Sequence, residues 1–241
     1  MKKINRFLSA CIILCISVSP AYSEEAVEAL QSIEISSSRL KTTKKKYAGS
    51  ITIITAEEIK QSGSPLVENL LRNYLSLGVF KQGGVGGEST IRMRGANAKN
   101  TLVIIDGVRA NGNTTGSFDF RNLTTENIER IEILRGPQTT LWGADAVGGV
   151  INIITKKGRG TPTHTLSFEG GSFGTFKETL GSSGAINDID YSVSASRTDI
   201  SGYSDFNENR GVSEKDGYEN TSLTSRVGTS FAGDGRAEFI G

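Results

Sequence analysis

The feature that most constrains this chain is a series of short β-branched segments between Ser89 and Gly158, each closed by a turn that contains glycine. Residues 101–105 read Thr-Leu-Val-Ile-Ile, a composition typical of a strand. The Asp106-Gly107 pair that follows supplies the positive φ angles of a tight hairpin turn. We therefore interpret Asp106 as a turn residue rather than as a catalytic carboxylate.

Two further segments, residues 131–134 and 150–155, alternate their side chains as the faces of a strand do, and both are expected to help build the core. Glu129 and Glu132 are three positions apart, so we expect them on opposite sides of a strand and not as an acid–base pair. The single histidine, His164, is expected to be an exposed strand residue. No enzyme activity is predicted, because neither a histidine metal cluster nor a catalytic constellation can be assembled.

Two short helices are predicted before these strands. Residues 55–58 read Thr-Ala-Glu-Glu, which is a capping box, and Gly63 is placed to end the first helix. Ser64 and Pro65 are placed to cap and open the second helix. Its shared apolar face consists of Leu66, Leu70 and Leu71. A stripe of this size is typical of core packing and needs no membrane role.

The N-terminus predicts export. Three basic residues precede a mostly apolar run over residues 7–18, and Ala21 and Ser23 are small residues at the positions that signal peptidase reads. We expect a signal peptide over residues 1–23. The alternative is a lipoprotein cleavage box ending at Cys11. Cleavage after the signal peptide removes both cysteines, so the mature chain has no disulfide framework.

The charge balance argues against one class of partner. The chain carries 27 basic and 26 acidic residues, and removal of the three basic residues of the signal leaves 24 against 26. The lysine-rich stretch over residues 41–46 is typical of a solvated linker. We therefore predict no nucleic-acid partner.

The composition changes after Gly158, where Ser, Thr, Gly and Tyr become frequent. Apolar residues recur weakly at every second position, as at Leu166 and Phe168 and again at Tyr191 and Val193. This pattern is typical of transmembrane β-strands, which turn apolar side chains outward and polar ones inward. Four or five such strands fit before the sequence ends, whereas a barrel needs at least about 8 to close.

Three separated pieces carry one recognisable pattern: Ser-Thr-Ile-Arg-Met-Arg-Gly, the Ile-Asp-Gly-Val turn, and Gly-Gly-Val-Ile-Asn-Ile-Ile. Together with the Arg94-Gly95 and Arg135-Gly136 pairs, they resemble the plug domain of TonB-dependent outer-membrane receptors over residues 31–158. Within that family, the sequence is most similar to the cobalamin-receptor branch.

The resemblance implies an α+β plug domain, a small mixed sheet with short helices, followed by the first antiparallel strands of an incomplete transmembrane β-barrel. After the signal peptide we expect a periplasmic leader over residues 24–45, the plug over residues 46–158 and the N-terminal part of the barrel over residues 159–241. The sequence is expected to be the front portion of a longer receptor.

In such receptors a segment after the signal adds as a strand to a TonB-type energy-transducing protein. The resemblance aligns this TonB box with Gln31, Ser32, Ile33, Glu34, Ile35, Ser36, Ser37 and Ser38. Glu34 and Ser37 depart from the family pattern, which has an apolar residue and alanine there. An ordinary disordered leader is the alternative.

Solute recognition in this family comes from plug loops that face outside. By similarity to cobalamin receptors, these loops are residues 82–90, 94–97 and 111–117. The implied small-molecule-binding residues are Glu88, Thr90, Asn97, Thr114 and Thr115. The glycines of the first loop let backbone amides approach a bulky solute, and a flexible connector is the alternative. Because the sequence departs from the cobalamin pattern at Glu88, a siderophore, haem or another scarce solute remains open as the substrate.

Two further roles follow from the resemblance. Arg94 and Arg135 would pair with barrel glutamates and lock the plug in the lumen, but those glutamates would lie mostly beyond the sequence, which leaves both arginines in water. Ordinary surface arginines beside turns are the alternative. Asp205, Asn207 and Asp216 are candidates for a calcium site in an external loop, and a solvated acidic loop is the alternative. No other cofactor is predicted.

Two functions therefore remain open. The first is a TonB-dependent receptor in the cell outer membrane for energised uptake of cobalamin or of a ferric siderophore or haem complex. The second is a soluble exported ligand-binding module, located in the periplasm, that uses the plug fold without transport.

Overall fold

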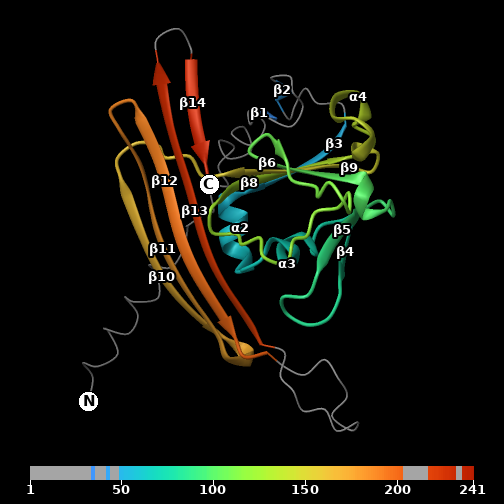
Figure 1. Cartoon of the computed structure of the whole chain (residues 1–241), viewed down its shortest axis with the longest axis horizontal. Coiled ribbons are helices and arrows are strands. Elements are labelled where there is room, and N and C mark those ends of the chain that lie inside the picture. The colour runs from blue at the N-terminus through green and yellow to red at the C-terminus, as the bar shows by residue number, and fades with distance from the viewer. Residues whose placement is uncertain (1–33, 36–41, 44–48, 203–216, 232–234) are drawn as a thin grey trace, which may run out of the picture.

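The computed structural model describes residues 34–35, 42–43, 49–202, 217–231 and 235–241. A mixed-sheet unit with short helices lies beside a long, curved antiparallel sheet (Figure 1). The expected signal peptide, most of the leader, the TonB box apart from Glu34 and Ile35, and the three calcium candidates lie outside the described residues.

A five-stranded sheet with the order β3-β8-β9-β6-β7 is the centre of the mixed-sheet unit. Its strands are β3 (Ser50–Thr55), β6 (Thr101–Ile105), β7 (Val108–Arg109), β8 (Ile128–Arg135) and β9 (Gly149–Thr155). The β6 and β9 strands are parallel and the other neighbours are antiparallel. Asp106 and Gly107 form the hairpin turn between β6 and β7 with φ angles of 48° and 86°, which confirms the turn prediction.

This sheet is buried on both faces. One face, which includes Ile131 and Ile151, packs with Ile59, Val67 and other residues of the two helices in a single apolar cluster. The opposite face forms a second cluster, whose members are Leu102, Ile104, Leu134, Ala146 and Val150. Burial on both sides explains why these strands read as nearly continuous apolar runs.

The first helix, α2 (Ala56–Ser62), has the predicted ends. The Thr55 hydroxyl accepts a hydrogen bond from the Glu58 N–H at 3.3 Å, and the Glu58 carboxylate accepts one from the Thr55 N–H at 2.7 Å. Gly63 ends the helix in the left-handed conformation at φ 60°. The capping box and the glycine stop are therefore confirmed.

The second helix, α3 (Val67–Leu71), begins later than predicted, and Ser64 does not cap it. Leu66 is its N-cap residue and forms an isolated antiparallel bridge with Thr124. The Thr125 hydroxyl also donates to the Ser64 carbonyl at 2.7 Å. These long-range bonds hold the backbone extended through Leu66 and delay the helix.

The remaining short elements extend from the mixed sheet. The strands β4 (Leu77–Lys81) and β5 (Ser89–Met93) form an antiparallel hairpin. Short helical turns follow at η3 (Ala98–Asn100), α4 (Thr139–Trp142) and η4 (Ala144–Ala146), and β1 (Glu34–Ile35) pairs with β2 (Thr42–Thr43). None of the described helices has the length and apolar content needed to cross a membrane.

The second sheet, which we call the strand wall, is a five-stranded antiparallel meander in sequence order. It consists of β10 (Thr163–Gly171), β11 (Thr175–Ile186), β12 (Ile189–Ile200), β13 (Tyr218–Phe231) and β14 (Gly235–Ile240), with a 3-10 turn, η5 (Ser172–Gly174), between the first two. The count of four or five strands is confirmed, and His164 is exposed in β10 as predicted.

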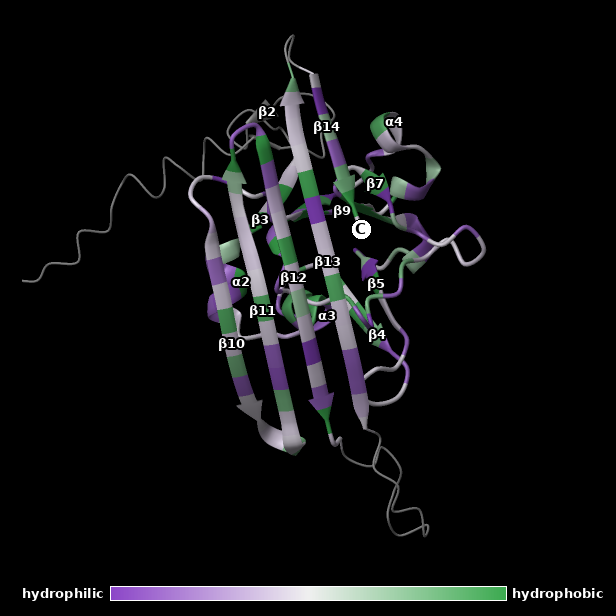
Figure 2. Ribbon diagram, turned by 60° about the vertical axis from the view of Figure 1, so that its left-hand side comes forward, coloured by the Kyte–Doolittle hydropathy of each residue, from purple (hydrophilic) through white to green (hydrophobic). Residues whose placement is uncertain are grey.

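The two faces of the strand wall differ in chemistry. Apolar side chains such as Leu166, Phe168 and Leu223 are exposed, although they belong to a sheet whose other face is partly buried. Figure 2 shows hydrophobic and hydrophilic residues alternating along the ribbons of the strand wall. The side chains that face the mixed-sheet unit are mainly polar and include the buried residues Lys177, Thr179, Ser192, Ser196, Thr198 and Arg226. The predicted alternation of outward apolar and inward polar residues is confirmed.

Candidate functional site

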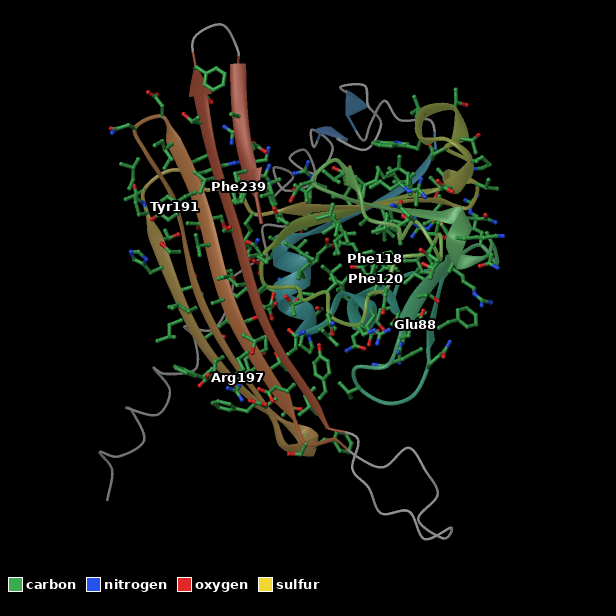
Figure 3. All side chains as sticks on the ribbon, in the orientation of Figure 1. Glu88, Phe118, Phe120, Tyr191, Arg197 and Phe239 are labelled. Carbon is green, nitrogen blue, oxygen red and sulfur yellow. The ribbon has the colours of Figure 1, made fainter. Side chains whose placement is uncertain are left out.

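The loop of residues 82–88 joins β4 to β5 and is a closed turn rather than a slack connector. The Gln82 N–H donates to the Glu88 carbonyl at 2.9 Å, and the Gly87 N–H donates to the Gly84 carbonyl at 3.1 Å. A Cβ atom on Gly87 would lie 1.8 Å from the Gln82 carbonyl oxygen, so this closure requires glycine. Figure 3 shows Glu88 at this hairpin, where its side chain is exposed.

An ion pair supports the base of this loop. Glu68 of α3 is fully buried, and its Oε1 lies 2.7 Å from Nζ of Lys81, the last residue of β4. A buried carboxylate requires a partner, because the unpaired charge is costly in a low-dielectric surrounding. The pair therefore fixes the point at which the glycine-rich loop leaves the strand.

The loop of residues 111–117 is held by one buried side chain. The Asn111 carboxamide accepts a hydrogen bond from the Val103 N–H at 2.7 Å and donates to the Thr101 and Gly116 carbonyls at 3.1 and 2.8 Å. Thr114 and Thr115 are exposed at the tip of this loop. Asn111 is thus a positioning residue whose own side chain faces away from solvent.

Hydrogen bonds and close packing join these loops into one set. The Ser89 N–H donates to Asp119 Oδ1 at 3.0 Å, and the Phe120 N–H donates to the Ser89 carbonyl at 2.8 Å. A Cβ on Gly116 would lie 3.2 Å from the Cβ of Lys99, so the 111–117 loop packs on η3, which follows the exposed Asn97. The structure therefore places all five small-molecule-binding candidates on one connected group of segments.

Asp119 is the electrostatic centre of this group. Burial alone would raise the pKa of its carboxyl, but the N–H groups of Ser89 and Arg121 and the Arg121 guanidinium donate to it and hold the pKa below its usual value. Hydrogen bonds to the charged form favour that form. The carboxylate stays ionised and ties β5 to the 118–121 segment.

This geometry predicts a specific acid sensitivity. Because the pKa of Asp119 is lower in the folded than in the unfolded chain, its stabilising effect is present above about pH 4 and is lost as the pH falls through the folded-state value. We expect Asp119→Asn, whose amide oxygen can accept the same backbone bonds, to lose less unfolding free energy than the wild type between pH 7 and pH 3. Urea denaturation at both pH values measures this difference, and equal losses in the two proteins would contradict it.

The two arginines of the Arg-Gly turns lie in different surroundings. Arg94 is exposed at φ 51°, whereas Arg135 is half-buried and donates to the Leu75 carbonyl at 3.2 Å and to the Thr52 hydroxyl at 2.7 Å. The expectation that both lie in water is therefore wrong for Arg135. Burial and the neighbouring charge of Arg94 lower the pKa of Arg135. Their role as a lock against barrel glutamates stays a prediction.

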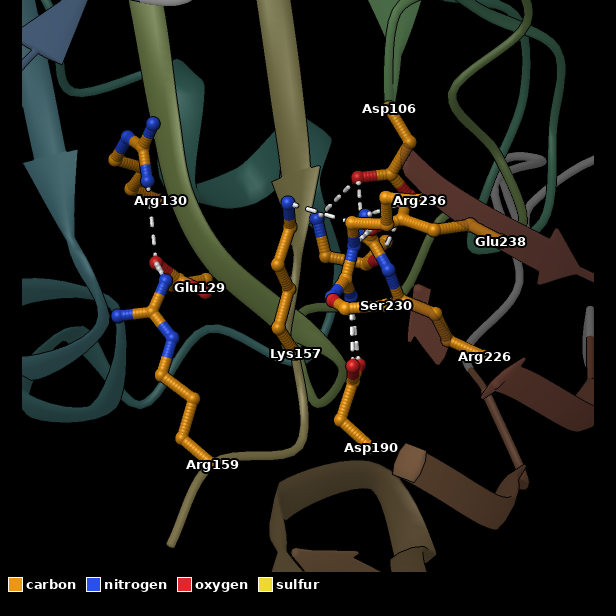
Figure 4. A network of polar contacts seen from close by, with 11 residues as sticks. Asp106, Glu129, Arg130, Lys157, Arg159, Asp190, Arg226, Ser230, Arg236 and Glu238 are labelled. Atoms are coloured by element: carbon orange, nitrogen blue, oxygen red, sulfur yellow. Dashed lines mark hydrogen bonds and ion pairs between the residues drawn. The ribbon is translucent and has the colours of Figure 1, made fainter. Parts of the chain in front are cut away.

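Two buried ion pairs join the mixed-sheet unit to the strand wall, and in each of them the acid lies on the unit and the cation on the wall. In the first, Asp106 Oδ1 lies 2.9 Å from Nη1 of Arg226 on β13, and both side chains are nearly inaccessible to solvent (Figure 4). The Thr155 N–H and hydroxyl donate to the same carboxylate at 3.0 and 2.6 Å. Arg226 also pairs with Glu238 of β14 at 2.5 Å.

The second ion pair lies at the segment that precedes β8. Glu126 pairs with Lys177 of β11, and both side chains are at least nine-tenths buried. The neighbouring Asn127 Oδ1 accepts a hydrogen bond from the Ser192 hydroxyl of β12 at 3.4 Å. Sequence reasoning missed both this contact and the ion pair of Asp106, although Lys177 and Arg226 stand out as charges at inward positions among Ser and Thr.

Glu129 and Glu132 do not lie on opposite sides of the strand, so that prediction is wrong. Arg130 Nη1 lies 3.1 Å from Glu129, and its Nε lies 3.0 Å from Glu132. An irregularity in the β8–β9 register between Ile128 and Arg130 inserts one residue and shifts the alternation. Figure 4 shows Glu129 between Arg130 and Arg159. The carboxylates of Glu129 and Glu132 are therefore both paired with the Arg130 guanidinium, and that of Glu129 also with Arg159.

Two cavities follow the contact between the unit and the strand wall. One of about 320 Å³ is lined by Asp106, Arg226 and Glu238 among others. The other, of about 380 Å³, lies between α2 and the wall and includes Lys177 and Thr179 in its lining. In the part of the chain that the structure describes, no three His, Cys, Asp or Glu side chains gather as a metal site.

Comparison with known proteins agrees with this architecture. Residues 43–150 match the family model of the TonB-dependent Receptor Plug Domain. The chain is 31% identical over 197 residues to the vitamin B12 transporter BtuB of Photobacterium profundum, a match that covers 81% of this chain and 32% of that protein. It is also 31% identical over 171 residues to the vitamin B12 transporter BtuB of Vibrio vulnificus, covering 71% and 28%.

Solved structures of receptors share the fold. The siderophore receptor PirA of Acinetobacter baumannii superposes with a TM-score of 0.66 at 23% identity, over 81% of this chain and 31% of that one. The ferripyoverdine receptor of Pseudomonas aeruginosa gives a TM-score of 0.69 at 18% identity, over 83% and 26%. The chain spans about a third of the length of the relatives it matches. It belongs to the TonB-dependent receptors, and residues 43–150 are its plug domain.

Proposed function

We propose that this chain serves the energised uptake of a scarce solute across the outer membrane, with cobalamin as the first candidate and a ferric siderophore as the second. The observation that carries the proposal is the connected group of plug loops, which presents Glu88, Asn97, Thr114 and Thr115 as exposed side chains. The two relatives named as vitamin B12 transporters support cobalamin. The structural neighbours named as siderophore receptors support the second candidate.

The proposal includes a location and a partner. The exposed apolar residues on the outer face of the strand wall support contact with the hydrocarbon of a membrane. A TonB-type energy-transducing protein is the proposed partner of residues 31–38, where an added strand would be held by backbone hydrogen bonds. Calcium binding at Asp205, Asn207 and Asp216 stays a prediction.

Titration of the purified chain with cyanocobalamin and with ferric enterobactin tests the solute. Removal of one solute hydrogen bond costs about 1 kcal/mol, which corresponds to roughly a fivefold weaker Kd. We therefore expect Glu88→Ala, Asn97→Ala and Thr115→Ala each to weaken binding of the preferred solute by about that factor. Thr139→Ala is the matched control, because Thr139 is exposed on α4 outside these loops. Equal affinities for all four variants and the wild type would contradict the assignment.

Cell fractionation separates transport from the alternative of a soluble module. A receptor is expected in the outer-membrane fraction. Recovery of the chain only in the soluble periplasmic fraction would instead favour a binding module.

A further inference from the structure

One residue of the strand wall contacts both the glycine-rich loop and the 118–122 segment of the plug. Tyr218 is the first residue of β13 and pairs in register with Ile200, the last residue of β12. It therefore lies at the end of the wall where the chain crosses between these two strands. In the described part of the wall, it is the one aromatic residue among the inward-facing positions of β10 to β13.

The ring of Tyr218 packs against the glycine-rich loop. A Cβ atom built on Gly86 would lie 2.4 Å from Tyr218 Cδ2 and 3.1 Å from its Cε2, so the loop backbone lies directly against the ring. Gly86 has a φ of +86°, a conformation that glycine adopts without strain. The absence of a side chain at this position allows the ring to contact the backbone.

The hydroxyl of Tyr218 reaches the second loop segment. It lies 3.4 Å from the Arg121 carbonyl oxygen and 3.3 Å from Asn122 Oδ1, and it donates to this pair of acceptors. Arg121 in turn bonds Asp119, which accepts from the Ser89 N–H. One side chain thus contacts both the loop that precedes β5 and the segment that bonds Ser89 of β5.

We propose that Tyr218 is a positioning residue that holds the glycine-rich loop closed against the 118–122 segment, and so orders Glu88 and Thr90 for solute binding. The inference rests on the proposed function for its last step. The ring restrains the loop by contact at Gly86, while the hydroxyl fixes the ring. Ordering a loop before binding removes an entropic cost that the solute would otherwise have to offset.

Hydrogen exchange of the full chain tests the closure without any solute. In Tyr218→Ala we expect the amides of residues 82–88, including the Gly87 N–H that bonds Gly84, to exchange at least about tenfold faster. Tyr218→Phe keeps the ring and should change this segment by less than about threefold. Tyr191→Ala is the matched control, since the Tyr191 hydroxyl meets only Ser182 of the neighbouring strand among its described side-chain contacts.

A second variant, in the loop, disrupts the same contact and keeps the test decisive if Tyr218→Ala fails to fold. In Gly86→Ala the added methyl group collides with the Tyr218 ring, so the loop cannot pack against that ring although Tyr218 is retained. This variant should therefore speed hydrogen exchange in residues 82–88 as well. If residues 82–88 exchange at the wild-type rate in both Tyr218→Ala and Gly86→Ala, the proposal is overturned.

The affinities for cyanocobalamin and for ferric enterobactin test whether closure of the loop serves solute binding. For the solute that the wild type binds, we expect Tyr218→Ala to raise the Kd at least about fivefold and Tyr218→Phe to restore most of the affinity. Unchanged Kd in Tyr218→Ala would show that loop closure does not serve recognition. If the wild type binds neither probe, the proposed function fails, and the exchange rates alone decide whether Tyr218 closes the loop.

Discussion

Replacement of Arg226 by methionine is expected to destabilise the full chain by about 3–5 kcal/mol, because it leaves the Asp106 carboxylate buried without its cation. Only 3% of the Asp106 side chain is exposed, so water cannot substitute for the guanidinium. Urea unfolding of the detergent-refolded chain, followed by tryptophan fluorescence, measures the loss. Asp106→Asn should restore part of the stability in the double variant, since asparagine tolerates the turn conformation and is neutral.

Arg197→Met is the control for this prediction. Arg197 forms the same kind of ion pair with Asp199 and Glu219, but all three side chains are more than two-fifths exposed on the strand wall. Exposed pairs contribute about 0–1 kcal/mol, so this variant should stay close to the wild type. If Arg226→Met unfolds at the same urea concentration as Arg197→Met, the ion pair between Asp106 and Arg226 does not contribute to the stability of the folded chain.

Gly149→Ala is expected to cost about 2–6 kcal/mol, as the sum of backbone strain and overpacking. Gly149 begins β9 with a φ of +147°, and a Cβ there would lie 2.3 Å from both the Leu134 carbonyl oxygen and Met93 Sδ. The carbonyl belongs to a ladder pair of the central sheet and cannot withdraw without breaking it. Thermal or urea unfolding of the full chain measures the effect.

Gly63→Ala is the control that separates the cost of backbone strain from the cost of steric overlap. Gly63 also has a positive φ, of +60°, but no atom lies within 4 Å of the position of its Cβ. Alanine should therefore cost only about 1–2 kcal/mol at this helix end. A Gly149→Ala variant no less stable than Gly63→Ala would show that β9 can shift to admit the methyl group.

The features that sequence predicted correctly are those that near neighbours determine. The capping box of Thr55 and Glu58, the stop at Gly63 and the Asp106-Gly107 turn each depend on residues within three or four positions. The alternation in the strand wall is likewise local, because successive side chains of a strand point to opposite faces. The resemblance to plug domains predicted how these elements are organised along the chain, with the plug first and the barrel strands after it.

The features that sequence missed depend on distant partners. Asp106 and Arg226 are 120 positions apart, and nothing in either segment indicates that the strands will bring them together. The start of α3 is likewise set by the bridge between Leu66 and Thr124, and the pairing of Glu129 with Arg130 by a register shift against β9. The contact between Tyr218 and Gly86 likewise depends on the fold, which brings together two residues that are distant in the sequence.

The joint between the plug and the wall is made largely of ions and hydroxyls, with Asp106, Glu126 and Asn127 facing Arg226, Lys177 and Ser192. When two such surfaces separate, each polar group can form hydrogen bonds with water in place of its partner, whereas exposing apolar surface to water costs free energy. Separating the plug from the wall therefore exposes charged and hydroxyl groups, which water can then solvate. Water can replace these contacts only after the plug and the wall have parted, because both ion pairs are nearly inaccessible to solvent.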